Sequence, residues 1–315
     1  MSKIAFVFPG QGSQTVGMMK EFYDTYGSVK NVFKEADEAL GFSLSGMCFN
    51  GPDDQLRLTY NTQPAILTCS IAALKVLEEH DLKPDVAAGH SLGEYSALVA
   101  AGALSFADAV RTVRKRGQFM QEAVPVGEGA MAAIIALETE KIVAICAEIT
   151  KIVGKPVEAV NFNCPGQVVI AGATEAVQKA AEELKAAGAK RAIMLPVSAP
   201  FHSTLMQPAA ERLAQELKKV TFSDASIPVY ANVTAKPETK ATEIESLLVK
   251  QAASPVLWQH TVENMINDGV TQFVEVGPGK VLTGFVKKIN KEFTGQNVED
   301  LASLEKTVAY LQEVR

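Results

Sequence analysis

The chain has 315 residues, of which 47% are apolar and 21% charged, as is usual for a globular protein with a substantial core. Its net charge of −6, without a long run of Lys or Arg, argues against nucleic acid as the main partner. No apolar run approaches the roughly 18 residues needed to span a membrane, and residues 4–8 are too few for a signal-peptide core. We therefore expect no membrane partner.

The cysteines point to a reducing compartment. Four are present, Cys48, Cys69, Cys146 and Cys164, and none forms a C-x-x-C pair. This spacing indicates neither a disulfide framework nor a zinc site. We expect a cytoplasmic protein without a metal.

The first predicted element is a buried strand at residues 4–8, followed by a glycine-rich loop at 9–14. The loop resembles a dinucleotide-binding fingerprint, but Thr15 stands where the third glycine is needed. Helical patterns then dominate to Glu79, most clearly over residues 62–79. A Rossmann cofactor site is not expected.

A serine lies at the centre of the next unit. Residues 86–88 form a short apolar strand, residues 89–93 read Gly-His-Ser-Leu-Gly, and a helix is predicted over 94–101. The two glycines allow strand and helix to approach closely, as in a nucleophile elbow. Ser91 is thus a candidate nucleophile; the alternative is that it only caps the helix.

The following predicted helix, residues 106–123, carries Arg111, Arg114, Lys115 and Arg116. At about 100° per residue, the first three lie opposite or beside the apolar face, where solvation explains them. Arg116 falls on the edge of the buried stripe. A buried guanidinium requires an anion, and no acid of the chain is an evident partner, so a substrate carboxylate is plausible.

The middle of the chain has a different order of predicted strands and helices. In order, we expect strands at 131–137, 157–163, 167–172 and 191–196, with helices at 140–152 and 175–187. This βαββαβ order is typical of a ferredoxin-like domain. The resulting domain prediction is a small unit at 127–197 inserted into a large α/β unit made of 1–126 and 198–315, with hinges near 125–129 and 196–200.

An α/β rhythm resumes after the insertion. We expect helices at about 204–219, 242–253, 256–268 and from about 298, and strands at 228–232 and 272–276. Together with the strands at 4–8 and 86–88, each followed by a helix, these predict a parallel sheet covered on both faces. The fold class is α/β.

A nucleophilic serine needs a base, and the chain has four histidines. His90 adjoins Ser91, and neighbouring side chains at a sharp turn point apart. His80 ends a surface helix, and His260 is most simply packed or exposed. His202 lies in the loop that returns to the large unit, and it is the best candidate. No acid between Ser91 and His202 is well placed for a triad, which favours a dyad oriented by a backbone carbonyl.

Five motifs, read in order, carry a family resemblance: 10–14 (Gly-Gln-Gly-Ser-Gln), 89–93, 116–120 (Arg-Gly-Gln-Phe-Met), Phe201-His202 and 276–279 (Val-Gly-Pro-Gly). The chain resembles the malonyl-CoA:acyl carrier protein transacylases of fatty acid synthesis and the acyltransferase domains of polyketide synthases. The match runs from near residue 4 to about 290. It implies an α/β-hydrolase-like core with an inserted ferredoxin-like domain.

The resemblance implies roles for the reacting groups. Ser91 would be the nucleophile and His202 the general base and acid, oriented by the backbone carbonyl of Gln251. The N–H groups of Gln11 and Leu92 would form the oxyanion hole, and glycines beside Gln11 would let that backbone come close.

The resemblance also implies substrate contacts. Arg116 would bind the malonyl carboxylate through two hydrogen bonds. Gln63 matches a pocket position, Asn163 and Arg191 are candidates for contacting the CoA arm, and Phe201 matches the malonyl-type signature.

The implied reaction is ping-pong: malonyl-CoA, a substrate and not a cofactor, acylates the serine, and the phosphopantetheine thiol of acyl carrier protein takes the malonyl group. No cofactor is implied. One alternative is a discrete polyketide-type acyltransferase. A serine esterase or thioesterase would share the elbow and base without needing Arg116, and a non-catalytic scaffold would leave the three residues together unexplained.

Overall fold

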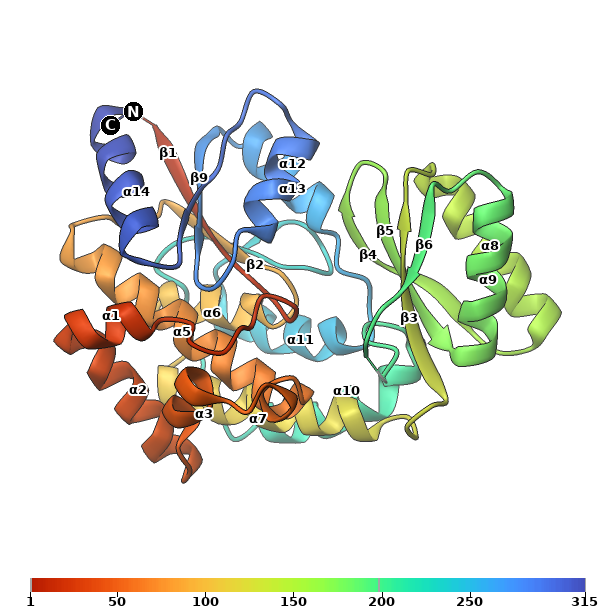
Figure 1. Cartoon of the computed structure of the whole chain (residues 1–315), viewed down its shortest axis with the longest axis horizontal. Helices are drawn as coiled ribbons and strands as arrows, with labels where there is room; N and C mark the ends of the chain where they lie inside the picture. The colour runs from red at the N-terminus through yellow and green to blue at the C-terminus, as the bar shows by residue number, and fades with distance from the viewer. Residues whose placement is uncertain (1, 198, 315) are drawn as a thin grey trace.

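Two β-sheets organise the chain, one in each half of the view in Figure 1. The computed structural model describes residues 2–197 and 199–314. Its strands are β1 (Lys3–Phe8), β2 (Val86–Gly89), β3 (Gly129–Ile135), β4 (Val157–Cys164), β5 (Gln167–Ala173), β6 (Arg191–Met194), β7 (Val229–Tyr230), β8 (Pro237–Glu238), β9 (Val270–Val276) and β10 (Gln296–Val298).

Helices make up most of the remainder. They are α1 (Lys20–Thr25), α2 (Gly27–Leu40), α3 (Leu44–Asn50), α4 (Asp53–Leu56), α5 (Thr59–Glu79), α6 (Gly93–Ala100), α7 (Phe106–Glu122), α8 (Thr139–Val153), α9 (Thr174–Ala186), the 3₁₀ turn η1 (Thr204–Met206), α10 (Gln207–Leu217), α11 (Ala241–Ala252), α12 (Trp258–Asn267), α13 (Val281–Ile289) and α14 (Leu301–Val314). Among the described residues, no helix is both long and apolar enough to cross a membrane.

The larger sheet has the strand order β10-β9-β1-β2-β7-β8, parallel except for the terminal β8. Because β1 is central, its residues are buried on both faces. Ile4, Phe6 and Phe8 pack with α2, α5, α6 and α7, whereas Ala5 and Val7 pack with α12 and α13. The continuous apolar run of this strand is therefore what a central parallel strand requires.

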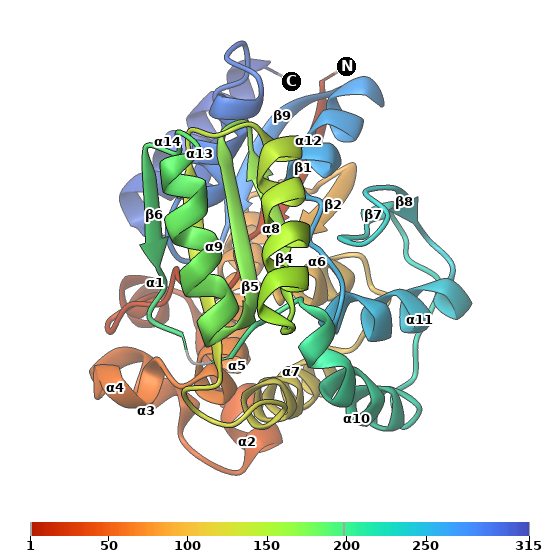
Figure 2. The ribbon, with the colours of Figure 1, turned by 90° about the vertical axis from the view of Figure 1, so that its right-hand side faces the viewer.

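The smaller sheet has the order β4-β5-β3-β6 and is antiparallel throughout. This is the βαββαβ arrangement expected for a ferredoxin-like unit. Its helices α8 and α9 cover the face that Figure 2 turns toward the viewer. The opposite face packs through Met131, Val169 and Ala171 against Met120 and Phe201 of the larger half.

The α/β class and the small-sheet topology predicted from the sequence are confirmed, with differences at short elements. The prediction that a helix follows every strand of the large sheet is wrong for β7, which turns back into the short strand β8. The strand β10 was not predicted; it occupies the expected start of the final helix, which begins at Leu301. The domain limits 1–126, 127–197 and 198–315 stay a prediction, and residues 1, 198 and 315 lie outside the described residues.

Candidate active site

Ser91 sits at the apex of a sharp turn between β2 and α6. Its backbone has φ 52°, a conformation that is costly for a residue with a Cβ. The flanking glycines make the turn possible: a Cβ on Gly89 would lie 1.8 Å from the carbonyl carbon of Gly93. A Cβ on Gly93 would lie 2.2 Å from the carbonyl oxygen of Phe8. The turn has the geometry of a nucleophile elbow.

The predicted base reaches the serine. The Ser91 Oγ lies 2.7 Å from His202 Nε2, and His202 Nδ1 lies 2.9 Å from the backbone oxygen of Gln251. Because a carbonyl only accepts, Nδ1 carries the proton, and Nε2 is left to accept the serine proton. Burial, with a smaller effect of Arg116, lowers the pKa of His202 to about 3, so the imidazole is neutral at pH 7 and its Nε2 is free to accept a proton.

Ser91 lines a cavity of about 110 Å³, and the two predicted oxyanion-hole residues, Gln11 and Leu92, line it as well. Leu92 precedes the first residue of α6, and Gln11 lies in the loop after β1. Among the described residues, no acceptor is bonded to the backbone N–H of either one. The loop comes close because Gly10 has no side chain: a Cβ there would lie 2.6 Å from the His90 carbonyl oxygen. These free donors can stabilise an oxyanion.

Arg116 is 1% exposed, and among the described residues its guanidinium is bonded to neutral groups alone. Nη1 donates to Gln63 Oε1 at 2.7 Å, and Nη2 donates to Gln251 Oε1 at 2.9 Å and to Ser91 Oγ at 3.2 Å. Among the ion pairs of the described residues, none involves Arg116. A buried cation beside the nucleophile can therefore accept an anionic substrate group.

The other basic residues of α7 behave differently. Arg111 and Lys115 are exposed and pair with Asp108 and Glu216. Arg114 is not the freely solvated residue that the sequence suggested: it is half-buried and donates to the backbone oxygen of Tyr60. Helical spacing placed it beside the apolar face, and the neighbouring helix α5 covers that side.

A polar network beneath the turn was missed by the sequence reasoning. Asn232 Oδ1 accepts the N–H of Ser91 at 2.7 Å, and Asn232 Nδ2 donates to the backbone oxygen of Gly89 at 2.7 Å. Glu94 Oε2 accepts from the backbone N–H of Asn232 and from Gln251 Nε2, each at 2.9 Å. Two signals were available: Glu94 directly follows the turn, and Asn232 follows a parallel strand at its carboxyl end.

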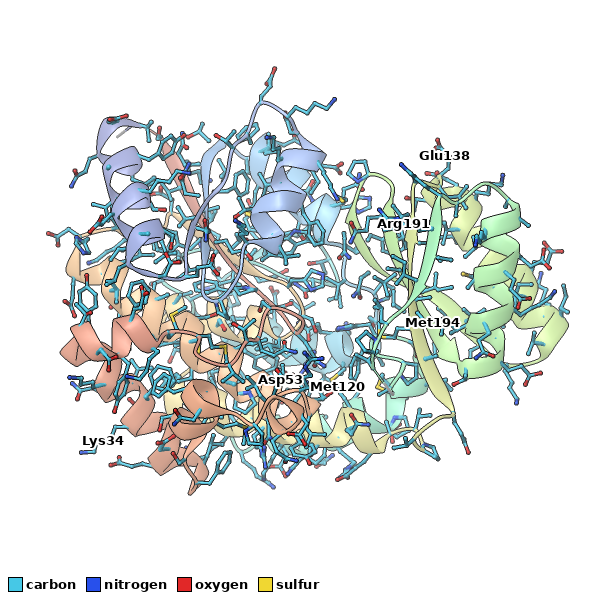
Figure 3. The ribbon with its side chains drawn as sticks, in the orientation of Figure 1. Lys34, Asp53, Met120, Glu138, Arg191 and Met194 are labelled. Carbon is cyan, nitrogen blue, oxygen red and sulfur yellow. The ribbon has the colours of Figure 1, made fainter. Side chains whose placement is uncertain are left out.

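The remaining predicted residues divide into two groups. Gln63 lines the central cavity, and Asn163 lines an adjoining cavity of about 280 Å³. Asn163 Oδ1 lies 2.8 Å from His90 Nε2, which explains how His90 is held away from Ser91. Arg191 is exposed on β6 and lines neither cavity; Figure 3 shows it well apart from Met120, which lines the central one. His260 is exposed.

A serine on an elbow, a neutral imidazole 2.7 Å away and two free backbone donors define a serine-dependent acyl-transfer site on an α/β fold. Comparison with known families gives the same class. Residues 5–310 match the acyl transferase domain model. The chain belongs to this acyltransferase family.

The relatives are similar along their whole length. The malonyl CoA-acyl carrier protein transacylase of Bacillus subtilis (strain 168) is 52% identical over 313 residues, which cover 99% of this chain and 98% of that protein. The crystal structure of an acyl carrier protein S-malonyltransferase from Vibrio cholerae has a TM-score of 0.94 at 50% identity, covering 97% of this chain and 100% of that one. A malonyl-transacylase in complex with its type II PKS acyl-carrier protein has a TM-score of 0.95 at 47% identity, covering 98% and 100%.

Proposed function

We propose that this chain transfers the malonyl group of malonyl-CoA to the phosphopantetheine thiol of acyl carrier protein, and so supplies extender units for fatty acid synthesis. The observation that carries the proposal is Arg116, a buried cation that forms no direct ion pair with any described residue and whose Nη2 is 3.2 Å from Ser91 Oγ. An esterase for neutral acyl groups has no use for such a charge. Proteins named as malonyl CoA-acyl carrier protein transacylases or S-malonyltransferases, which are about half identical to this chain over nearly its whole length, support the same activity.

In the first half-reaction, Ser91 Oγ attacks the thioester carbonyl while its proton passes to His202 Nε2. The carbonyl oxygen becomes negative, and the N–H groups of Gln11 and Leu92 stabilise it. The C–S bond then breaks, and the imidazolium returns its proton to the CoA sulfur. The malonyl group remains on Ser91 as an ester.

The second half-reaction runs the same chemistry with a new thiol. His202 removes the proton of the pantetheine thiol, and the sulfur attacks the carbonyl carbon of the malonyl ester. The bond from that carbon to Ser91 Oγ then breaks, and His202 returns the proton to Oγ. No step changes an oxidation state, so we propose that no redox cofactor takes part. We also propose that no metal takes part, because the N–H groups of Gln11 and Leu92 stabilise the oxyanion. The residues already present supply each proton transfer.

Arg116 would select the acyl group. Its two Nη groups, which bond amide oxygens of Gln63 and Gln251, form a fork that matches a carboxylate. Bound there, the malonyl carboxylate places the thioester carbonyl next to Ser91. An acetyl group lacks this anchor.

The thioester arm would reach Ser91 through the adjoining cavity. His90 and Leu195 line both cavities, and the second also contains Asn163 and the α13 residues Leu282 and Phe285. We propose that the pantetheine chain passes here, between the large unit and the inserted unit at 127–197, with Asn163 as a contact. Contact of Arg191 with the CoA arm stays a prediction. The four buried free cysteines suit a reducing compartment, and we propose the cytoplasm.

The test is a partition experiment with the protein, malonyl-CoA and acyl carrier protein bearing its phosphopantetheine. We expect malonyl-carrier to form faster than free malonate. Faster release of malonate would make the protein a hydrolase. Carriers of fatty acid and polyketide synthesis, compared in parallel, separate the two pathways by their relative rates.

Covalent labelling identifies the nucleophile. Radiolabelled malonyl-CoA should label the wild-type protein, and Ser91→Ala should remove the label. Label that persists in the variant would assign the ester to another residue.

A further inference from the structure

Glu94 is a buried carboxylate that the mechanism above does not use. It lies in the first turn of α6 and is 3% exposed. Its Oε2 is bonded to the backbone N–H of Asn232 and to Gln251 Nε2, both neutral donors. Ionised carboxylates are rarely buried this deeply without a cation, so its charge requires an explanation.

The negative charge of Glu94 is linked to a positive charge, that of Arg116, through the side-chain amide of Gln251. Gln251 is fully buried, donates from Nε2 to Glu94 and accepts at Oε1 from Arg116 Nη2. The charges of Glu94 and Arg116 therefore act on one another across this side chain. Of the other groups packed around Glu94, Asn232 and Gln251 are neutral, and burial keeps Tyr95 protonated by raising its pKa.

We propose that Glu94 is the resting counter-charge of Arg116, and that the incoming malonyl carboxylate replaces it, so that Glu94 takes up a proton from solvent. This inference rests on the proposed function. Two carboxylates near a single guanidinium, one in contact with it and the other across Gln251, repel each other in a buried site, and protonating one of them removes the excess negative charge. The proton binds a carboxylate oxygen of Glu94 and leaves again when malonyl departs; no other bond changes.

The free protein is set for this exchange. Burial raises the pKa of Glu94 to about 7, although Arg116 and the two hydrogen bonds oppose the rise. A second anion at Arg116 offsets the part of that opposition that comes from Arg116, and so raises the pKa of Glu94 further. An acetyl group carries no charge, so it should leave Glu94 ionised. Glu94 is thus a positioning residue that acts on the substrate through Gln251 and Arg116.

The experiment is titration calorimetry at about pH 8 in two buffers of different ionisation enthalpy. Ser91→Ala prevents acylation, and malonyl-CoA and acetyl-CoA are the probes. Because burial raises the pKa of Glu94 to about 7, about nine-tenths of this carboxyl is ionised at pH 8 before binding. A further rise of its pKa on binding therefore predicts net uptake of up to about 0.9 proton with malonyl-CoA and close to none with acetyl-CoA. Adding Glu94→Gln should abolish the uptake.

Glu275→Gln is the matched control. Glu275 on β9 is also fully buried with a raised pKa, but it accepts from Thr283 on α13 and is bonded to neither Gln251 nor Arg116. Its replacement should leave the uptake unchanged. Equal uptake with both thioesters, or uptake that survives Glu94→Gln, would overturn the inference.

A second measurement covers the case in which Glu94→Gln does not fold. In the Ser91→Ala protein, the Kd for malonyl-CoA should rise with pH above 7 by up to about tenfold per unit relative to acetyl-CoA. A flat ratio contradicts the inference. Malonyl transfer by the wild-type protein is measured in parallel: transfer without proton uptake rejects this inference alone, whereas absence of malonyl binding and transfer rejects the proposed function as well.

Discussion

Replacing Arg116 with alanine should remove the preference for malonyl-CoA over acetyl-CoA. The guanidinium is 1% exposed and is bonded by two amide oxygens and by the nucleophile. In water, a carboxylate gains little from a cation, but in a closed cavity the same pair is poorly screened. In the proposed mode of binding, the malonyl group depends on this contact, and the acetyl group does not make it.

The size of the effect follows from the burial. Removing one partner of a desolvated, hydrogen-bonded charge pair costs about 2–5 kcal/mol. This corresponds to a fall of about 30- to 5,000-fold in the ratio of kcat/KM values for the two thioesters. The substitution also leaves oxygens of Gln63 and Gln251 without a donor, which affects both substrates; the ratio isolates the contribution of the charge.

The assay measures kcat/KM for malonyl-CoA and acetyl-CoA with acyl carrier protein as acceptor. Arg116→Lys keeps the charge but not the planar fork, so it should give an intermediate ratio. Arg111→Ala removes an exposed arginine of the same helix and should change nothing. An unchanged ratio in Arg116→Ala would refute the clamp, because no other described cation lines the cavity.

Three further outcomes are expected. Gly93→Ala should destabilise the fold by about 1–3 kcal/mol in denaturant unfolding, because the new Cβ would clash with the Phe8 carbonyl. Gly284→Ala, which places a Cβ in open space on α13, should stabilise the fold by about 0.5–1 kcal/mol. Equal effects of the two substitutions would contradict the close approach of α6 to β1 at Gly93. His202→Ala should slow acylation by about 10²–10⁴-fold in rapid-quench labelling, and a normal rate would exclude it as the base. Two buried groups give the stability opposite dependences on pH: stability is lost as pH falls from 6.5 toward 3, because neutral His202 must gain a proton, and is lost as pH rises from 4.5 through 7, because Glu94 must lose one. Glu94→Gln should remove only the loss between pH 4.5 and 7, as measured by unfolding across pH 4–9.

Local patterns predicted the parts of the fold that depend on local residues. The turn around Ser91 was predictable because its two glycines, strand and helix are contiguous in the chain. The ferredoxin-like order of β3 to β6 followed from strand and helix periods, and the observed sheet confirms it. Arg116 stood out because helical spacing placed a charge on the buried edge of α7, where it lies in the structure.

Elements fixed by distant contacts were harder to predict. The strands β8 and β10 have two and three residues, which are too few to show the alternating pattern of a strand in the sequence. In the structure β8 pairs with β7, and β10 pairs with β9. Asn232 is close to Ser91 because β7 lies beside β2, a pairing that no local pattern encodes. The resemblance, and not residue spacing, supplied Gln251 as the group that orients His202.

At this site His202 is oriented by an uncharged group, the backbone carbonyl of Gln251, and the other contacts of Gln251 show why a charged group would be unfavourable here. Its carbonyl accepts from His202 Nδ1, and its side chain accepts from Arg116, so the group that we propose activates the serine and the group that we propose binds the substrate meet at one residue of α11. A carboxylate orienting His202 from this position would lie next to Arg116 and compete with the malonyl carboxylate for it. A carbonyl fixes the same tautomer without adding charge. Nucleophile activation and selection of an anionic acyl group can then coexist in one small cavity.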